Sequence, residues 1–193
     1  MDIPFNITRL SHVHLTSRDL DRTRHFYEKG LGLEVTDQDE NWLYLRAIEE
    51  TGHHAIVFEK TPPADAGVCR AVTYRMYEDD DIRRAHDWFN ERGHRVDYVE
   101  RPHQGMTLRL TDAVGVPIEF CATMDQSENQ MRRFHNHSGG RLAFLDHIQI
   151  ATHDVQTAYQ FYNDIGFRLT EYTATDGSDE MWGVWLKRKN NTQ

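Results

Sequence analysis

One pattern of apolar and polar positions recurs along the chain and predicts a repeated unit. Residues 10–15 (Leu-Ser-His-Val-His-Leu) and 145–150 (Leu-Asp-His-Ile-Gln-Ile) alternate or run apolar over six positions, which is typical of a strand. The same residue types then return at matching offsets, so His12 and His147 are equivalent. Residues 68–74 open a further copy between them. We therefore define a first module (residues 10–58), a second module (68–121) and a third module (145–186).

Each opening strand is followed by a predicted helix with one apolar stripe. Positions i, i+3, i+6 and i+7 lie on one face of an α-helix, so each helix should pack that face against a sheet. Asp or Ser residues precede the helices as N-caps, and Gly30, Gly93 and Gly166 should end them in the left-handed conformation. In chain order the stripes are Leu20, Thr23, Phe26 and Tyr27; Ile82, Ala85, Trp88 and Phe89; Val155, Ala158, Phe161 and Tyr162.

Further strands complete each module. The sequence predicts them at 33–35, 42–48 and 55–58, at 95–99, 107–110 and 116–121, and at 168–172 and 182–186. Residues 112–115 (Asp-Ala-Val-Gly) predict a turn. The unit is thus β-α-β-β-β, and the third module lacks its last strand.

These modules predict an α+β protein. One module buries one side of a curved sheet, and two modules joined edge to edge form a cupped, eight-stranded half-barrel. We expect a complete two-module domain at residues 1–122 and a polar linker at 123–140 with a short helix near 130–135. Residues 141–193 then form the first module of a second domain, which makes three modules of an expected four.

Composition narrows the functional classes. The formal net charge is −9, from 22 basic and 31 acidic residues, which argues against nucleic-acid binding. Apolar runs are too short to span a membrane, and no secretory signal follows Met1. Cys69 and Cys121 have no metal-type spacing and are expected as reduced core residues of a cytoplasmic protein.

The order and spacing of several motifs resemble the vicinal oxygen chelate superfamily, which includes glyoxalase I and the type I extradiol dioxygenases. The similarity is closest to the two-domain enzymes that act on 3,4-dihydroxyphenylacetate (homoprotocatechuate). The segments that carry it are 26–33 (Phe-Tyr-Glu-Lys-Gly-Leu-Gly-Leu), 53–57 (His-His-Ala-Ile-Val), 115–120 (Gly-Val-Pro-Ile-Glu-Phe), 141–147 (Arg-Leu-Ala-Phe-Leu-Asp-His), 164–167 (Asp-Ile-Gly-Phe) and 185–189 (Trp-Leu-Lys-Arg-Lys).

The resemblance implies a structural first domain and a second domain that holds Fe(II), or in some members Mn(II), through two His and one Glu. His147 matches the first ligand, whereas the other two would lie in a fourth module. We therefore expect the chain to be C-terminally truncated and inactive as it stands. The intact protein would cleave a catechol beside its hydroxyls with O₂, in aromatic-compound catabolism, as a homo-oligomer.

The resemblance also implies substrate-contacting positions. Trp185 matches a pocket aromatic, and Gln149 shares a strand face with His147. An acid-base His follows the Trp-x-x-Arg-Lys motif in such enzymes, but Gln193 stands at about that offset here, so the catalytic acid-base residue is unassigned. The plainer interpretations are a packed core histidine for His147 and strand core for Trp185.

The repeat places the corresponding ligand positions of the first domain at His12, Ala71 and Glu119. We favour a relic site in which Glu119 joins a structural ion pair. The alternative is a residual metal site completed by His14 or His54, which would make the chain a glyoxalase-like isomerase. A non-catalytic binding or accessory module is the other competing function.

Overall fold

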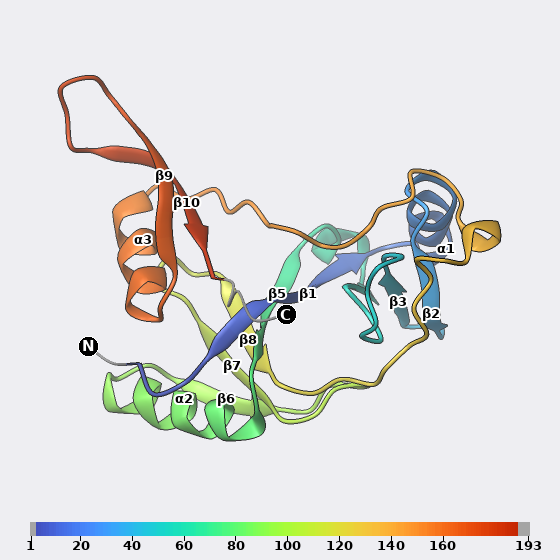
Figure 1. Cartoon of the computed structure of the whole chain (residues 1–193), viewed down its shortest axis with the longest axis horizontal. Helices are drawn as coiled ribbons and strands as arrows, with labels where there is room; N and C mark the ends of the chain where they lie inside the picture. Colours follow the sequence, from blue (N-terminus) through green and yellow to red (C-terminus); the bar gives the residue numbers. More distant parts are fainter. Residues whose placement is uncertain (1–2, 189–193) are drawn as a thin grey trace.

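The computed structural model describes residues 3–188 and contains an eight-stranded mixed sheet built by the first two modules (Figure 1). The strand order is β2-β3-β4-β1-β5-β8-β7-β6. The first module supplies β1 (Ile7–Ser17), β2 (Glu34–Gln38), β3 (Trp42–Arg46) and β4 (Ile56–Lys60), and the second supplies β5 (Cys69–Met76), β6 (Val96–Val99), β7 (Thr107–Thr111) and β8 (Pro117–Cys121). The predicted α+β class and the strands of both modules are confirmed.

The two modules meet along their opening strands. β1 runs antiparallel to β5, with Val13 opposite Val72 and His14 opposite Ala71. On their outer sides β1 pairs in parallel with β4, and β5 pairs in parallel with β8. Each module thus repeats the other about the β1–β5 seam, as expected for β-α-β-β-β units joined edge to edge.

The first helix differs from the regular helix that its apolar spacing predicts. α1 (Leu20–Arg24) passes directly into a π-helical turn, η1 (His25–Gly30). A π turn holds more residues than an α turn, so the following side chains rotate out of the stripe. Phe26 is consequently 57% exposed, although the pattern predicted burial. Gly30 ends the π turn without a positive φ, which corrects the C-cap prediction; the left-handed residue is Gly32, with φ of 81°.

The second helix follows its predicted pattern. α2 (Asp79–Glu91) buries Ile82, Ala85 and Phe89 completely against the sheet. Gly93 adopts a φ of 78°, as a C-terminal glycine should. The turn at 112–115 is also confirmed, since Asp112 Oδ1 accepts hydrogen bonds from the backbone N–H groups of Val114 and Val116.

The third module attaches through its helix to the core beneath the second module. α3 (Val155–Asp164) is capped by Asp154, whose carboxylate accepts from the Thr157 N–H. Phe161 and Tyr162 of the predicted stripe enter the same hydrophobic cluster as Phe89. The Tyr162 hydroxyl also donates to Asp112 Oδ2 at 2.9 Å. These contacts hold α3 on the first domain.

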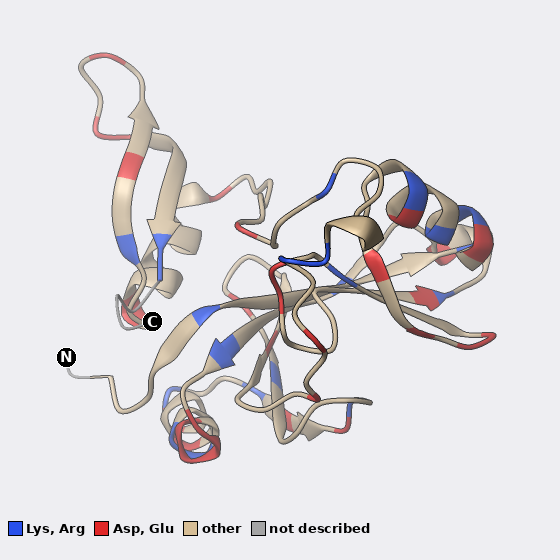
Figure 2. Ribbon diagram, turned by 45° about the vertical axis from the view of Figure 1, so that its right-hand side comes forward, with Lys and Arg blue, Asp and Glu red and all other residues tan. Residues whose placement is uncertain are grey.

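The segment between the second and third modules, predicted as a polar linker, packs against the first module. The helix predicted at 130–135 is a short 3₁₀ turn, η3 (Phe134–Asn136). Another 3₁₀ turn, η2 (Pro63–Asp65), lies elsewhere in the chain, between β4 and β5. The Gly140 N–H donates to the Gly30 carbonyl at 3.0 Å. A Cβ on Gly32 would collide with the Ser138 carbonyl oxygen, so this close approach needs glycine. Basic and acidic residues both lie around α1, next to this contact (Figure 2).

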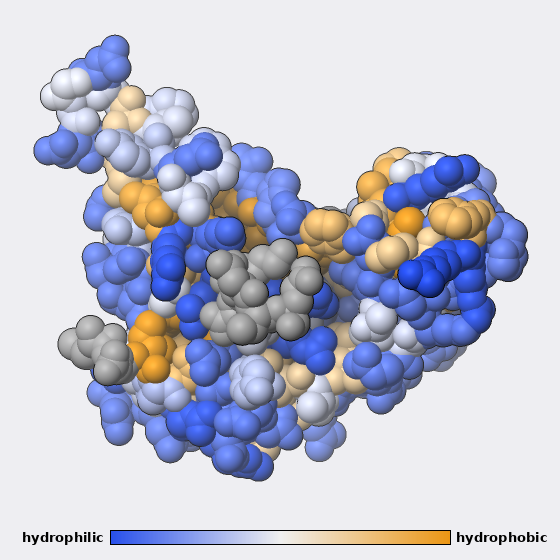
Figure 3. Space-filling view, viewed as in Figure 1, coloured by the Kyte–Doolittle hydropathy of each residue, from blue (hydrophilic) through white to orange (hydrophobic). Residues whose placement is uncertain are grey.

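The predicted opening strand of the third module, residues 145–150, is not formed. The segment is an extended stretch without regular secondary structure, and it crosses the hollow between the third module and the first module (Figures 1 and 3). A strand exists only where a partner accepts and donates its main-chain hydrogen bonds, and no described strand lies in register with these residues. The remaining strands, β9 (Arg168–Ala174) and β10 (Met181–Lys187), form a two-stranded sheet with each other and pair with no other described strand.

Candidate functional site

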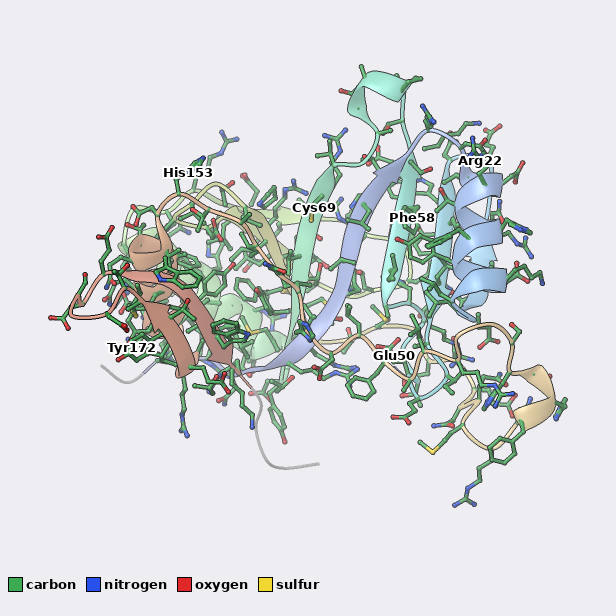
Figure 4. All side chains as sticks on the ribbon, turned by 90° about the horizontal axis from the view of Figure 1, so that it is seen from above. Arg22, Glu50, Phe58, Cys69, His153 and Tyr172 are labelled. Carbon is green, nitrogen blue, oxygen red and sulfur yellow. The ribbon has the colours of Figure 1, made fainter. Side chains whose placement is uncertain are left out.

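His147, the predicted metal ligand, lies on the unpaired extended segment. Its side chain is 84% exposed, and Nδ1 lies 3.1 Å from Asp146 Oδ2. Glu50, labelled in Figure 4, anchors the segment by accepting a hydrogen bond from the Leu145 N–H at 3.1 Å. The imidazole is therefore accessible, oriented by a neighbouring carboxylate, and free of the aliphatic packing that the plainer interpretation required.

The two predicted substrate contacts do not converge on His147 in this structure. Gln149 is exposed on the same extended segment. Trp185 is 53% exposed on β10, where it stands opposite Glu171 of β9 and its carbonyl accepts from the Thr170 hydroxyl at 3.0 Å. No ring contact or hydrogen bond joins these residues within 3–188. Gln193, at the offset of the acid-base residue, lies outside the described residues.

His147 fits one position of a metal site. An imidazole whose Nδ1 is held by a carboxylate presents Nε2 to a metal, the usual arrangement of a histidine ligand. Within residues 3–188, however, no three His, Cys, Asp or Glu side chains are grouped as metal ligands. The described residues thus fit one donor of a two-His, one-Glu set and do not by themselves hold the ion.

His12, the equivalent residue of the first domain, lies on a paired strand and is buried. His12 of β1 lies opposite Thr73 of β5, and Thr73 lies opposite Glu119 of β8, so these residues form one row across three strands. Ala71, which the repeat places at the middle ligand position, lies opposite His14 instead. All the row members are at most 2% exposed.

Two arginines neutralise Glu119. Arg101 approaches both carboxylate oxygens, with Nη2–Oε1 at 2.6 Å and Nε–Oε2 at 3.2 Å, and Arg109 Nη1 lies 2.9 Å from Oε1. This pairing matches the structural role that we favoured for Glu119. It also opposes the glyoxalase-like alternative, because a carboxylate held by two guanidinium groups is a poor ligand for a cation.

The histidines around this row are held neutral. Burial, reinforced by neighbouring charges, lowers the pKa of His12 to about 3 and that of His14 to about 4. Glu59 Oε2 lies 3.2 Å from His14 Nε2, but burial and three arginines outweigh it. Burial also lowers the pKa of His54, whose ring lies 4.5 Å from that of His12 between centroids. The small pocket that these residues line therefore contains the neutral imidazoles of His12, His14 and His54 together with the Arg101–Glu119 ion pair.

Sequence reasoning found His12, His14, His54 and Glu119 but missed the residues that decide their chemistry. Arg101 follows β6 in a loop and Arg109 lies on β7, and neither stands in a motif with Glu119. The one available signal was strand alternation, since Arg109 is directly opposite Glu119 in the β7–β8 pair.

Comparison with known proteins agrees with this architecture. The profile of the Glyoxalase/Bleomycin resistance protein/Dioxygenase superfamily matches residues 9–120, which is more than half of the chain. The chain therefore belongs to this superfamily, the vicinal oxygen chelate superfamily inferred from the motifs.

Similar proteins extend the match beyond the first domain. Metapyrocatechase of Geobacillus stearothermophilus is 26% identical over 96% of this chain and 59% of its own length. Manganese-dependent 2,3-dihydroxybiphenyl 1,2-dioxygenase of Geobacillus genomosp. 3 is 22% identical over 86% of this chain and 56% of its own. The anaerobic 3,4-dihydroxyphenylacetate complex of homoprotocatechuate 2,3-dioxygenase from Brevibacterium fuscum superposes with a TM-score of 0.90 at 32% identity, covering 97% of this chain and 60% of that one.

The chain thus spans rather more than half the length of these relatives. In the described residues no helix has the length and apolar character needed to cross a membrane.

Proposed function

We propose that this chain is part of an extradiol dioxygenase that cleaves 3,4-dihydroxyphenylacetate next to its hydroxyl groups. One observation carries the proposal: the chain superposes along 97% of its length on an enzyme whose structure was determined with that catechol. The names of the two sequence relatives support the broader class, ring-cleaving dioxygenases.

His147 is the proposed ligand of Fe(II), with Mn(II) as the other candidate because one relative is manganese-dependent. The Asp146 carboxylate at Nδ1 supports this role. A metal with two His and one carboxylate keeps open positions where a catechol and O₂ can meet, and that is the chemistry it supplies when bound. Gln149 and Trp185 are the proposed contacts to the substrate.

The proposed reaction consumes one O₂ per catechol. One ring carbon–carbon bond breaks, both oxygen atoms enter the product as an aldehyde and a carboxylate, and no external reductant is needed. The 193-residue chain alone should show little or no activity, because His147 is one donor of a larger set.

The test is an aerobic ring-cleavage assay on the protein as its gene encodes it, loaded with Fe(II) or Mn(II). We expect a yellow semialdehyde and equimolar O₂ uptake from 3,4-dihydroxyphenylacetate. His147→Ala should abolish both and lower the metal content, whereas His153→Ala, a nearby exposed histidine, should leave them unchanged. An unaltered rate in His147→Ala would remove the proposal, and a stable protein without ring cleavage or metal would favour the accessory module.

A further inference from the structure

A buried carboxylate of the first domain holds the backbone next to His147. Glu50 stands in the turn after β3 and is 8% exposed. Its Oε2 accepts from the Ala47 N–H at 3.0 Å within the first module, whereas its Oε1 accepts from the Leu145 N–H at 3.1 Å. Two residues of extended chain span at most about 7 Å. A fixed Leu145 therefore confines His147, two residues later, to a small volume.

The main chain of the same turn continues this contact. The Ile48 N–H donates to the Leu142 carbonyl at 3.2 Å, and the Glu49 N–H donates to the Ala143 carbonyl at 2.9 Å. Residues 48, 49 and 50 thus each bind a group of the stretch 142–145. Successive anchors of this kind fix the direction of a backbone as well as its position, so the first domain decides how the chain approaches His147.

Arg46 holds Glu50 in place. Its side chain is 1% exposed, and the guanidinium donates to the Glu50 carbonyl at 2.7 Å and to the Glu128 carbonyl at 2.6 Å. The same group pairs with Glu34 of β2. The guanidinium bonds to the Glu50 main chain, which leaves both carboxylate oxygens to the two backbone N–H groups. Because a buried polar group is costly to leave unpaired, this arrangement resists displacement.

We propose that Glu50 is a positioning residue for the metal site, which acts through the Leu145 N–H and sets the place of His147. The first domain thereby contributes to metal affinity, in addition to its structural role. This inference rests on the proposed function, because it requires His147 to be a metal ligand. Hydrogen-bonded groups that support a ligand change metal affinity by about 10- to 100-fold, and we expect an effect of that size.

The test is a titration with Mn(II) of the protein as its gene encodes it, with free Mn(II) measured by electron paramagnetic resonance. Glu50→Ala removes both acceptor oxygens and should raise the Mn(II) dissociation constant about 10- to 100-fold. Glu50→Gln keeps the side-chain volume and one acceptor oxygen, so it should raise the constant by a smaller factor. Glu49→Ala is the matched control, because this neighbour is exposed and keeps its main-chain N–H; it should match the parent.

A second measurement follows the hydrogen bond itself. Exchange of the Leu145 amide proton, observed by NMR in protein labelled with ¹⁵N-leucine, should be faster in Glu50→Ala than in the parent and unchanged in Glu49→Ala. Circular dichroism of the metal-free proteins gives a temperature at which the variants are folded, and the dissociation constants are compared there. If Glu50→Ala does not fold, Glu50→Gln decides the result.

A merely structural role for Glu50 would lower the unfolding temperature and leave Mn(II) binding by the folded protein unaltered. That result, in Glu50→Gln and in folded Glu50→Ala, would overturn the positioning role alone. A parent protein that binds neither Mn(II) nor Fe(II) would instead overturn the metal role of His147 and the proposed function with it. The two failures are therefore distinguishable.

Discussion

His12 and His147 occupy the same position in two repeated modules, yet their surroundings are opposite. His12 is 2% exposed in a central strand with a partner on each side, whereas the His147 side chain is 84% exposed on a segment that pairs with no described strand. The sequence around them is similar. The difference teaches that burial and secondary structure at this position come from the neighbouring module, whose strand must be present for the segment to become one.

The largest expected contrast is in amide hydrogen exchange. In the 193-residue chain, the amides of residues 12–14 should exchange more slowly than those of 146–151 by a factor on the order of a thousand or more. The reason is that opening β1 requires disruption of the sheet, whereas the main chain of residues 146–151 makes no hydrogen bond to any residue in the described range 3–188. Mass spectrometry of peptic fragments measures this. Equal protection of the two segments would contradict the comparison.

Replacing an aromatic ring of a predicted helix stripe should lower stability strongly where the ring is buried and weakly where the π turn exposes it. Phe89→Ala should lower the free energy of unfolding by about 3–5 kcal/mol, because its ring is fully buried between α2, the sheet and α3. Phe26→Ala is the matched control on the first helix and should cost less than about 0.5 kcal/mol. Urea unfolding followed by circular dichroism checks both. A large loss in Phe26→Ala would show that the π turn does not expose that ring in solution.

The neutral histidines of the first domain should make stability depend on pH. The pKa values of His12 and His14 are lowered to about 3 and about 4, so between about pH 6.5 and pH 4 the unfolded chain binds protons that the folded chain does not. Stability should therefore fall as pH drops through this window, by up to about 1.4 kcal/mol per pH unit for each imidazole.

The variant His12→Gln tests the contribution of His12 to this pH dependence, because it removes one titratable imidazole without adding a charge. Its unfolding free energy, measured by urea titration at several pH values, should decline less steeply with acid than that of the parent. An identical slope in both proteins would mean that His12 is protonated in the folded state at mildly acidic pH.

Much of the fold could be predicted because its signals are local. Alternation predicted the strands of the first two modules, and the helix stripes predicted the burial of Ile82, Phe89 and Phe161. The candidate site was harder to predict. The position of His147 followed from the repeat and the family motifs, but its surroundings did not, since Asp146 and Glu50 act through contacts that no periodicity encodes.

The sequence by itself determined the modules, their order and the equivalence of His12 and His147, because residue spacing decides which side chains share a face of a helix or strand. Tertiary structure alone decided the rest. It rotated Phe26 to solvent through a π turn, brought Arg101 and Arg109 onto Glu119, and left residues 145–150 extended and without a partner among the described strands. The ion pairs and the strand pairing depend on groups that are not neighbours in sequence, since both are satisfied only where the folded chain places a partner.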